Sequence, residues 1–530
     1  MRPWAISLAA TVVISLLLPS AGSAATLVPL APSSAWDSTP IHGSSPPGDP
    51  RLFVVERGGG VRIVEDGVLQ TRPFLTVPNV DTFNERGLLS IAFAPDYATS
   101  GLFYVFTVAA GPDALDSSGE TGDLRIVEYR RSAADPDLAD PSSARLVLKL
   151  AHGGVANHNG GQLAFGPEGL LYVTIGDAAV SANAQDLSND LGKLLRIDPN
   201  PPSGVGFGIP PSNPFLGTVG ARPEIYALGL RNPFRASFGP SGELVLPDVG
   251  QTTWEEVNVG RPTGTAAATT LAGANLGWPT CEAACPSPNP SFVDPIFQYG
   301  HGPGATEATG CAIVGGYIVR DPALTGLTGR YLYGDFCRND LRTLDLDAPG
   351  ADPRPAGVSI PTSDGGPLGF GEDASGCLYV MTAVTVYRLA ESAAAGTACA
   401  PPSASDAGRG PSSGPGDTIR PRLSLSAARR QRLRRFVTVF ASCDEACALR
   451  AGGTLGLSAA TASRSLPLIA ATGSGQAGQR LRLRLKLRRK ALMQAKWARR
   501  HGAKVRVRAR VRATDPSGNT VTRVVRVLLR

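Results

Sequence analysis

The sequence predicts an all-β chain, in which a six-bladed β-propeller is followed by a small β-sandwich of immunoglobulin-like type. The 530 residues include 62 Gly and 45 Pro, a composition typical of many short strands joined by turns. A short pattern of an apolar strand beside a turn returns six times along the first 390 residues. The last hundred residues alternate between basic and apolar side chains with a period of two, which indicates half-buried strands.

The repeated pattern is clearest in LAFGPEGLLYV, and it recurs in degenerate form. Its Gly-Pro-x-Gly segment predicts a tight turn between neighbouring strands. The spacing between units, about 50 to 90 residues, suits blades of four strands with some long insertions. Loops of a closed propeller converge on its central opening, where ligands usually bind. The strand cores begin near Leu52, Leu102, Leu171, Leu244, Tyr331 and Leu378.

The N-terminus predicts export. Residues 1–24 have a basic start, a short apolar run and small residues before a cleavage position after Ala24 or Ala25, as in a signal peptide. A retained N-terminal anchor is the alternative. No later segment is predicted to cross the membrane. We therefore expect a secreted, extracellular or cell-envelope protein.

Export also predicts that the eight cysteines form disulfides. Both close pairs have CxxxC spacing without a matching second pair or a nearby histidine, which disfavours zinc. The sequence alone does not determine the connectivity, although 443–447 is favoured because these two cysteines are alone in the C-terminal domain. The simplest pairing, by proximity, is 281–285, 311–337, 377–399 and 443–447.

Composition predicts the domain boundaries: a propeller over 27–399, a flexible linker over 400–419, and a basic β-sandwich over 420–530 with a helix near 488–500. The last domain has 27 Lys and Arg against 3 Asp and Glu. This charge suits an anionic cell-wall polymer or an anionic membrane, and export argues against nucleic acid. Equally, the basic residues fit a solvated strand face.

The unrepeated polar residues of HNGGQLAFGPEGLLYVTIGD form the first candidate site. A neutral imidazole at His158 can accept a proton, as the base of an alcohol oxidation must. Asp177 ends the following strand, where a carboxylate could hold the imidazole in the right tautomer. The spacing alone fits equally well a surface-loop histidine with an aspartate in an ordinary turn.

A second cluster lies in GLRNPF and DVGQTTWEEVN. The guanidinium of Arg231, fixed before Pro233, could polarise a carbonyl or bind a carboxylate, or it could simply brace a loop. Asp248, Glu255 and Glu256 suit calcium, a hard ion that prefers oxygen ligands, although solvated acids fit the spacing too.

A third cluster lies in NERGLLSIAFAPDY. Glu85 and Arg86 could line the propeller's opening, or they could form a surface ion pair that contributes little to stability.

Residues 27–389 resemble the glucose/sorbosone dehydrogenase family of exported six-bladed propellers. The resemblance rests on seven motifs in order: ERGLLSIAFAPDY, HNGGQLAFGPEGLLYVTIGD, LGKLLRID, GLRNPF, DVGQTTWEEVN, NLGWP and FGEDASGCLYV. It implies a sugar substrate, pyrroloquinoline quinone as cofactor, and Ca²⁺.

The resemblance also implies roles for individual residues. His158 corresponds to the general base and Asp177 to its orienting partner, and Arg231 lies near the reactive quinone carbonyl with Asn232 beside it. Glu85 stands where the enzymes often have a Gln that lines the site. The segment Asp248–Gly250 matches the backbone around the calcium that holds the quinone. Glu256 and the carbonyl of Leu276 match a calcium position.

Two departures weaken the expected quinone clamp. The place of a late lysine in the enzymes holds Cys337, followed by Arg338. The place of an R-x-R-D segment reads GGPLGFGED over 365–373, without arginine. Because the quinone carries three carboxylates, burying them without cationic partners is costly. The chain in this respect resembles the Hedgehog-interacting-protein-like branch.

We therefore predict an exported sugar dehydrogenase that oxidises an aldose or related polyol. The alternatives are a non-catalytic carbohydrate- or protein-binding propeller, favoured by the missing arginines, and a calcium-dependent lactonase. The lactonase is disfavoured because His158 and Arg231 match the dehydrogenase motifs.

Overall fold

The structure is a computed structural model that describes residues 25–396 and 422–529 with short gaps. The predicted signal peptide, 1–24, and the predicted linker, 400–419, lie outside the described residues. The chain divides into two compact units, Met1–Ser403 and Ala404–Arg530. The gaps are 202, 264–268, 303–308, 322, 350–352 and 393–395 in the first stretch, and 428–429, 432, 434–435, 444–446, 460–461, 469–470, 476–480, 488, 501–503 and 515–519 in the second.

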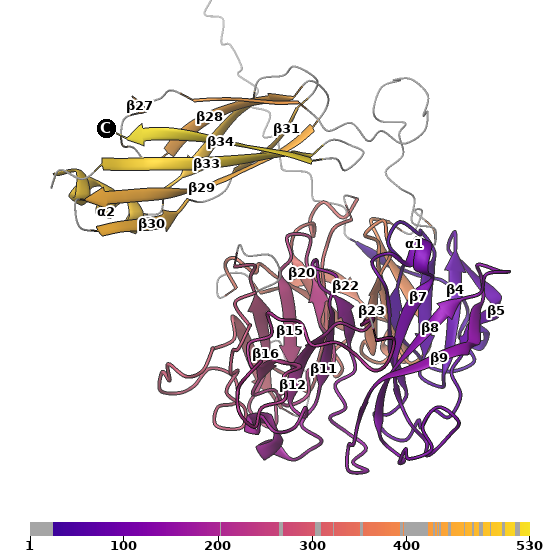
Figure 1. Cartoon of the computed structure of the whole chain (residues 1–530). Helices are drawn as coiled ribbons and strands as arrows, with labels where there is room; N and C mark the ends of the chain where they lie inside the picture. The colour runs from indigo at the N-terminus through magenta and orange to yellow at the C-terminus, as the bar shows by residue number, and fades with distance from the viewer. Residues whose placement is uncertain are drawn as a thin grey trace, which may run out of the picture. The chain divides into compact units, whose positions relative to one another are not determined.

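Six four-stranded antiparallel blades form the first unit (Figure 1). The first blade consists of β2 (Pro40–Ser44), β3 (Leu52–Glu56), β4 (Gly60–Glu65) and β5 (Val68–Thr76), and the second of β6 (Leu88–Phe93), β7 (Leu102–Val108), β8 (Leu124–Arg131) and β9 (Ala139–Leu150). The third consists of β10 (Leu163–Phe165), β11 (Leu171–Ile175), β12 (Lys193–Ile197) and β13 (Ile225–Leu228).

The fourth blade consists of β14 (Ser237–Phe238), β15 (Leu244–Asp248), β16 (Trp254–Gly260) and β17 (Phe297–His301), with β18 (Thr309–Gly310) paired in parallel at its edge. The fifth consists of β19 (Ile313–Ile318), β20 (Tyr331–Asp335), β21 (Asp340–Leu344) and β22 (Arg354–Ser359). The sixth consists of β23 (Gly369–Glu372), β24 (Leu378–Met381), β25 (Val386–Ala390) and β1 (Thr26–Pro29). Short helical turns lie between strands: α1 (Tyr97–Ser100), η1 (Ser33–Ala35), η2 (Ser181–Gln185) and η3 (Thr362–Asp364).

The six units predicted from the repeat are confirmed. Each predicted strand core is the first residue of the second strand of a blade, in β3, β7, β11, β15, β20 and β24. These strands are buried along their whole length, which is why they appear in the sequence as short continuous apolar runs.

The ring closes through both ends of its sequence. Strand β1 completes the last blade by pairing with β25, so the first residues after the predicted cleavage position become the outer strand of the sixth blade. The innermost strands β2 and β23 also pair in parallel, which joins the first and sixth blades into one sheet. Closure leaves no long open sheet edge inside the ring.

Polar side chains fill the centre of the ring. Nη2 of Arg235, in the fourth blade, donates to the carbonyl oxygen of Ile41 in the first blade, 2.8 Å away. Burial lowers the pKa of Arg235 to about 9. Gln162 Nε2 lies 3.2 Å from Nε2 of His42, and both side chains are buried. These contacts connect the first blade with the third and the fourth across the centre of the ring.

The second unit contains two sheets and one helix. One sheet has the order β26 (Leu423–Ser426), β28 (Phe436–Cys443), β32 (Leu481–Lys486). The other has the order β27 (Arg430–Gln431), β34 (Thr520–Leu529), β33 (Lys504–Thr514), β29 (Cys447–Ala459), β30 (Ala462–Pro467), and β31 (Ala471–Gly475) also pairs with β29. Helix α2 (Arg489–Arg500) confirms the helix predicted there.

Buried apolar residues of both sheets form one core in this unit, including Val437 and Leu485 on one sheet and Val507 and Val527 on the other. The immunoglobulin-like topology stays a prediction. Among the described residues, no helix is both long and apolar enough to cross a membrane.

We predict that a chain ending at Ile419 keeps the thermal midpoint of the propeller and any catalytic activity of the full chain. The reason is that no sheet in the described residues contains strands of both units. Differential scanning calorimetry and activity of the shortened chain, compared with the full chain, test this. A lower midpoint of the propeller transition, or loss of activity in a folded shortened chain, would contradict it.

Candidate active site

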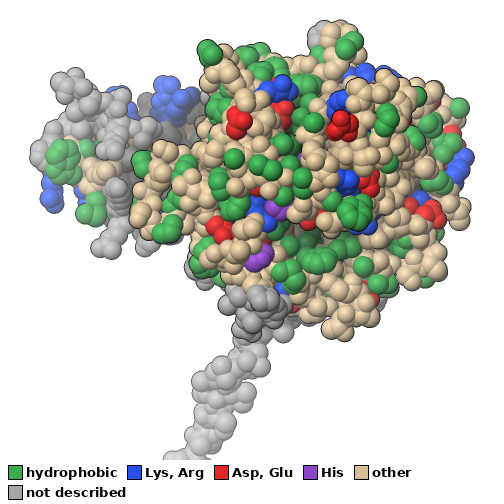
Figure 2. Space-filling model, turned by 90° about the horizontal axis from the view of Figure 1, so that it is seen from below, with side chains coloured by type: hydrophobic (Ala, Val, Ile, Leu, Met, Phe, Trp, Pro, Cys, Tyr) green, Lys and Arg blue, Asp and Glu red, His purple; other side chains and the backbone are tan. Residues whose placement is uncertain are grey.

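The predicted site residues lie at one end of the blades. Because consecutive strands of a blade run in opposite directions, the segment that leads into the first strand lies at the same end as the turn between the second and third strands. His158 and Arg231 precede the first strands β10 and β14, and Asp177 follows the second strand β11. The repeated Gly-Pro-x-Gly turn joins the first and second strands and lies at the opposite end. Figure 2 shows a face of the propeller unit where histidine side chains lie beside a hollow.

The main chain around His158 is held on both sides. Its N–H donates to the carboxylate of Glu85 at 2.9 Å, and its carbonyl oxygen lies 3.0 Å from Nε2 of His152, a buried side chain. His158 has a φ of 57°, a left-handed conformation that is uncommon outside glycine and tends to occur at functional sites. Gly176 packs against it, because a Cβ there would lie 2.0 Å from the carbonyl oxygen of His158.

The side chains of His158 and Asp177 form a buried dyad. Nδ1 of His158 lies 2.7 Å from Oδ1 of Asp177, whose side chain is 1% exposed. The carboxylate also accepts the N–H of Ala179 at 2.8 Å and Nε1–H of Trp278 at 2.9 Å. A carboxylate at Nδ1 favours the tautomer with its proton on that nitrogen, so Nε2 is left as a proton acceptor. Within the described residues, Nε2 of His158 has no hydrogen-bond partner.

Arg231 is fixed by its neighbours before any ligand binds. Its Nε donates to Oε1 of Gln251 at 2.7 Å, and its Nη1 donates to the carbonyl oxygen of Val249 at 3.1 Å. The guanidinium carbon lies 5.9 Å from the ring centre of Trp278, within cation–π range. The carbonyl oxygen of Arg231 accepts the N–H of Asp177 at 2.8 Å. Trp278 therefore contacts both the dyad and the arginine.

Asn232 and Asp248 hold the loops of the site together. Asp248 accepts the N–H of Arg231 on one carboxylate oxygen and the N–H of Asn232 on the other, each at 2.7 Å. Oδ1 of Asn232 accepts the N–H of Gly160 at 3.1 Å, which connects the GLRNP loop to the loop of His158. Both side chains are buried. That these two side chains contact the cofactor stays a prediction. In the structure they hold the loops of His158 and Arg231 in place.

Asp248 and Glu256 form a pair of buried carboxylates on neighbouring strands, directly opposite each other in the register of β15 and β16. Burial raises the pKa of Glu256 to about 8, and the charge of Asp248 adds to this shift. Burial also raises the pKa of Asp248 to about 6, even though its two N–H donors oppose the shift.

The residues at this pair fit a cation. A cavity of about 10 Å³, roughly one water-sized sphere, lies beside Asp248, Gly250 and Glu256. Ca²⁺ prefers oxygen ligands, carboxylates among them, and a bound cation would offset the repulsion between these two buried charges. Leu276 is buried in the adjoining loop, two residues before Trp278, and its carbonyl as a ligand stays a prediction.

Gly250 belongs to a turn held by Glu282. A Cβ at Gly250 would lie 1.6 Å from the carbonyl oxygen of Trp254, so the turn requires glycine. Oε1 of Glu282 accepts the N–H groups of Gln251, Thr252 and Thr253 at 2.6 to 2.9 Å. The predicted disulfide between Cys281 and Cys285 is confirmed, and Glu282 lies inside the loop that it closes. The loop thus fixes the turn that presents Gln251 to Arg231.

The other acidic candidates have separate partners. Glu255 forms a short contact with Nδ1 of His301, accepts the N–H of Ile313 at 2.9 Å, and has the N–H of Gly250 at 3.4 Å. Glu85 contacts the main chain of His158, whereas Arg86 pairs with Asp81 at 2.5 Å. The alternative of a surface ion pair between Glu85 and Arg86 is therefore wrong, because the buried Arg86 has Asp81 as its partner.

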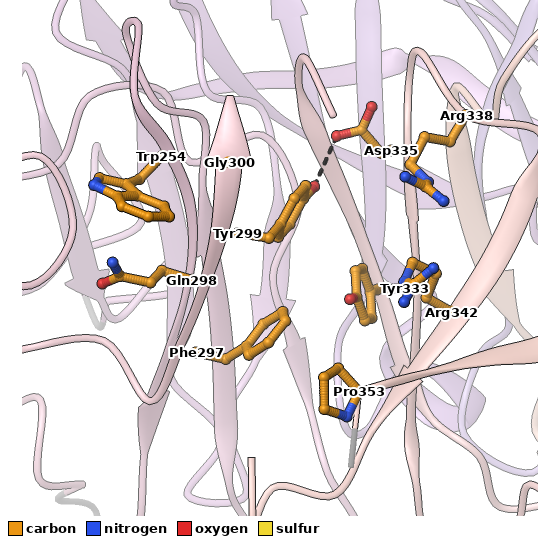
Figure 3. A pocket seen from close by; sticks show the side chains of 10 residues that line it. All are labelled: Trp254, Phe297, Gln298, Tyr299, Gly300, Tyr333, Asp335, Arg338, Arg342 and Pro353. Atoms are coloured by element: carbon orange, nitrogen blue, oxygen red, sulfur yellow. Dashed lines mark hydrogen bonds between the residues drawn. The ribbon is translucent and has the colours of Figure 1, made fainter. Parts of the chain in front are cut away.

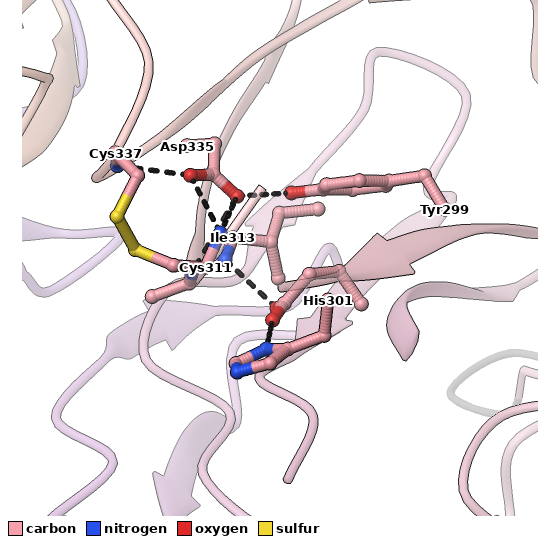
Figure 4. The surroundings of a disulfide bond; sticks show 8 residues. Tyr299, His301, Cys311, Ile313, Asp335 and Cys337 are labelled. Carbon is pink, nitrogen blue, oxygen red and sulfur yellow. Dashed lines mark hydrogen bonds and ion pairs between the residues drawn. A yellow bond between two sulfur atoms is a disulfide. The ribbon is translucent and has the colours of Figure 1, made fainter. Parts of the chain in front are cut away.

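Cys337 forms a disulfide with Cys311, as predicted (Figure 4). The carboxylate of Asp335 accepts the main-chain N–H groups of both cysteines and the hydroxyl of Tyr299, at 2.7 to 3.1 Å. Cys377 and Cys443 are also disulfide-bonded. The side chains of Cys399 and Cys447 lie outside the described residues, so these two pairings stay predictions.

The segment that replaces R-x-R-D offers no cation. Residues 365–373 contain neither Arg nor Lys. A Cβ at Gly366 would lie 2.1 Å from the carbonyl oxygen of Phe336, so this segment packs tightly against the turn that contains Cys337. Arg338, next to that cysteine, binds Asp340 through Nε and Nη2 at 2.9 and 3.0 Å. The residues fit the catalytic part of a quinone site but do not provide the expected clamp for its carboxylates.

Three residues with clear contacts in the site were missed by the sequence analysis: His152, Trp278 and Glu282. Trp278 lies in the NLGWP motif, and its indole N–H was a signal that could have been used. His152 and Glu282 contact main-chain groups, and no sequence pattern indicates such contacts.

Comparison with known proteins identifies the family. The sequence profile of the family described as Glucose / Sorbosone dehydrogenase matches residues 40–351, more than half of the chain. The chain therefore belongs to the glucose/sorbosone dehydrogenase family.

Two curated relatives and one solved structure illustrate its range. The chain is 29% identical to human Hedgehog-interacting protein over 356 residues, which cover 63% of this chain and 47% of that protein. It is 32% identical to aldose sugar dehydrogenase YliI of Escherichia coli over 233 residues, 43% of this chain and 55% of that protein. The chain thus spans about half the length of the curated relatives it matches. The PQQ-bound aldose sugar dehydrogenase of Streptomyces coelicolor shares the fold, with a TM-score of 0.51 and 22% identity over 69% of this chain and 98% of that one.

We predict that Ca²⁺ raises the thermal midpoint of the propeller more at pH 8.5 than at pH 5.5. The folded-state pKa of Glu256, about 8, lies above its ordinary value. Without metal, the free energy of unfolding therefore falls as the pH rises from about 4.5 to 8. In this range the Glu256 carboxyl ionises in the unfolded chain but is still protonated in the folded one. A cation needs the ionised carboxylates, so its effect grows over the pH range in which they ionise, about 6 to 8.

At a hundredfold excess over its dissociation constant, Ca²⁺ would stabilise the fold by about 2.7 kcal/mol. Glu256→Gln should abolish most of this gain and flatten its pH dependence. Equal gains at both pH values, or an undiminished gain in the variant, would exclude these carboxylates as the calcium ligands.

Proposed function

We propose that the propeller oxidises an aldose or a related polyol, with pyrroloquinoline quinone as the hydride acceptor and Ca²⁺ bound nearby. The observation that carries the proposal is the buried His158–Asp177 dyad, with Trp278 bridging it to Arg231. This arrangement presents a proton acceptor and a fixed guanidinium at one end of the ring, where family membership leads us to expect a sugar dehydrogenase site.

His158 would take the proton of the substrate hydroxyl at Nε2 as the C–H hydride leaves. Asp177 would keep the proton of the imidazole on Nδ1 and stabilise the imidazolium that forms. When bound, the quinone supplies the two-electron acceptor. Arg231, already fixed by Gln251 and Val249, would stabilise negative charge that develops near it without reorganising.

A non-catalytic carbohydrate- or protein-binding propeller is the second candidate. It is favoured by the absence of Arg and Lys from residues 365–373, and by the similarity to Hedgehog-interacting protein. On this hypothesis the dyad would be a structural element of the binding face. A calcium-dependent lactonase is less favoured, because His158 and Arg231 match the motifs of the dehydrogenases.

Quinone titration separates the two main candidates. We expect the full chain, with pyrroloquinoline quinone and Ca²⁺, to give dye-linked oxidation of aldoses with weak retention of the cofactor. His158→Ala should lower turnover by about 10²- to 10⁴-fold and leave quinone binding unchanged, because a general base acts on the transition state. Arg231→Ala should lower both turnover and quinone affinity.

Arg222→Ala is a matched control, since Arg222 forms its ion pairs with Asp190 and Glu224. If folded protein binds no quinone in calorimetry at any Ca²⁺ concentration, the dehydrogenase proposal fails and the binding propeller becomes the better one.

We also infer that the protein is exported to the cell surface or the extracellular space. The two described disulfides support this, because such bonds persist in oxidising compartments. The basic second unit would then contact an anionic cell-wall polymer. Arg506 and Arg508 are exposed at alternate positions of β33, and Arg526 of β34 lies directly opposite Arg508. Like charges opposite each other on a sheet repel, and a bound polyanion would relieve that repulsion.

We predict that the full chain binds a soluble poly(glycerol phosphate) chain in a salt-dependent manner. Replacing Arg506, Arg508 and Arg526 by Ser should weaken binding by about tenfold, and raising the ionic strength to about 1 M should remove most of it by screening. Replacing Arg482 and Arg484 by Ser, on the other sheet, is the matched control. Equal loss in both variants would show that total charge, and not this face, determines binding.

A further inference from the structure

A cleft of about 300 Å³ lies between the fourth and fifth blades, apart from the His158 site (Figure 3). Its walls come from the outer strand β17 of one blade and from β20, β21 and Pro353, just before β22, of the next. The volume is at the lower end of the range for small-molecule sites. Trp254 is the one described residue that lines both this cleft and the small cavity beside Asp248.

One wall of the cleft is aromatic. Phe297 and Tyr299 lie two residues apart on β17 and pack against the buried ring of Tyr333 (Figure 3). The rings of Phe297 and Tyr299 have their centres 6.1 Å apart at an angle of 30°, and Tyr299 and Tyr333 are 6.2 Å apart. Tyr299 is fixed by its hydroxyl, which donates to Asp335 at 2.7 Å. A flat ring with an apolar face could lie on this wall without the aromatic rings having to move.

The opposite wall carries guanidinium groups. Asp340 accepts two hydrogen bonds from Arg338, one on each oxygen, at 2.9 and 3.0 Å. Nη1 of Arg342 contacts the same carboxylate at 3.2 Å. One carboxylate is therefore shared between two cations. Arg342 is only 16% exposed and lies beside the ring of Tyr333 in the cleft. Its further N–H groups can donate to a ligand carboxylate, which guanidinium groups bind strongly.

We propose that this cleft binds a small acid whose carboxylate is attached to a six-membered ring. The ring would pack on the partly buried Phe297 and Tyr299, and the carboxylate would accept hydrogen bonds from Arg342. A uronic acid and an aromatic acid share this chemistry. The proposal is independent of the proposed dehydrogenase function, since none of these three residues contacts the His158–Asp177 dyad.

Calorimetry on the full chain tests the proposal with two pairs of probes. Glucuronate is compared with glucose, and 4-hydroxybenzoate with 4-hydroxybenzyl alcohol, so that each pair differs at the carboxylate. We expect at least one acid to bind about tenfold more tightly than its neutral partner. Binding of glucuronate alone identifies acidic sugars, and binding of 4-hydroxybenzoate alone identifies aromatic acids.

Variants locate the binding. Arg342→Gln should remove the tenfold preference for the acid, and Phe297→Ala should weaken both members of the pair. Arg72→Gln, which removes an exposed guanidinium paired with Asp135, is the matched control and should have no effect. His158→Ala should also bind the acid normally, which separates this cleft from the proposed active site.

Thermal midpoints of the variants verify that they fold, and Arg342→Lys serves as a second variant if Arg342→Gln does not. Arg342→Lys keeps the charge but loses the planar fork, so it should bind the acid with intermediate affinity. No binding of either acid at millimolar concentration, equal affinity for acid and neutral probe, or normal binding in the Arg342 variants would overturn the proposal.

Discussion

The carboxylate of Asp177 is the contact on which the rest of the candidate site depends. It receives Nδ1 of His158 from the loop before β10, Nε1–H of Trp278 from the loop after β16, and a main-chain N–H of its own turn. A carboxylate with only 1% of its surface exposed is costly to bury unless its oxygens are satisfied. Removing any of the three donors would leave a buried charge short of a partner. The orientation of the imidazole and the place of the indole are therefore determined together.

The repeated turn and the candidate site lie at opposite ends of the third and fourth blades. The Gly-Pro-x-Gly turns only have to connect the first and second strands, so nearly the same residues serve in several blades. At the other end, each loop meets loops of other blades, and each needs different side chains. His158, Asp177 and Arg231 therefore stand out in the sequence as polar residues that do not recur.

The difference between local strand patterns and contacts between loops of different blades determines what could be predicted from the sequence. The second strands of all six blades were found, because buried strands are continuous apolar runs that begin at residues such as Leu171 and Leu244. The disulfide pairs within 281–285 and 311–337 followed from proximity. Trp278 was missed because its contact to Asp177 spans 101 residues, and Glu282 because it binds main-chain N–H groups. Contacts of this kind depend on how blades are arranged around the ring, which local periodicity does not encode.

The charges at the site indicate how its ligands must depend on one another. Among the described residues, Glu85, Asp177, Asp248 and Glu256 contribute carboxylates, whereas Arg231 is the cation held beside the dyad. Pyrroloquinoline quinone carries three carboxylates and would bind among these negative charges. Residues 365–373 would give it no arginine partner, because they contain none. A divalent cation at Asp248 and Glu256 would neutralise the charge of these two carboxylates. Because linkage between two ligands is reciprocal, a quinone that binds better with the cation in place must also tighten the binding of the cation. On the proposed function, weak binding of either ligand alone is therefore expected, because residues 365–373 provide no cation for the carboxylates of the quinone.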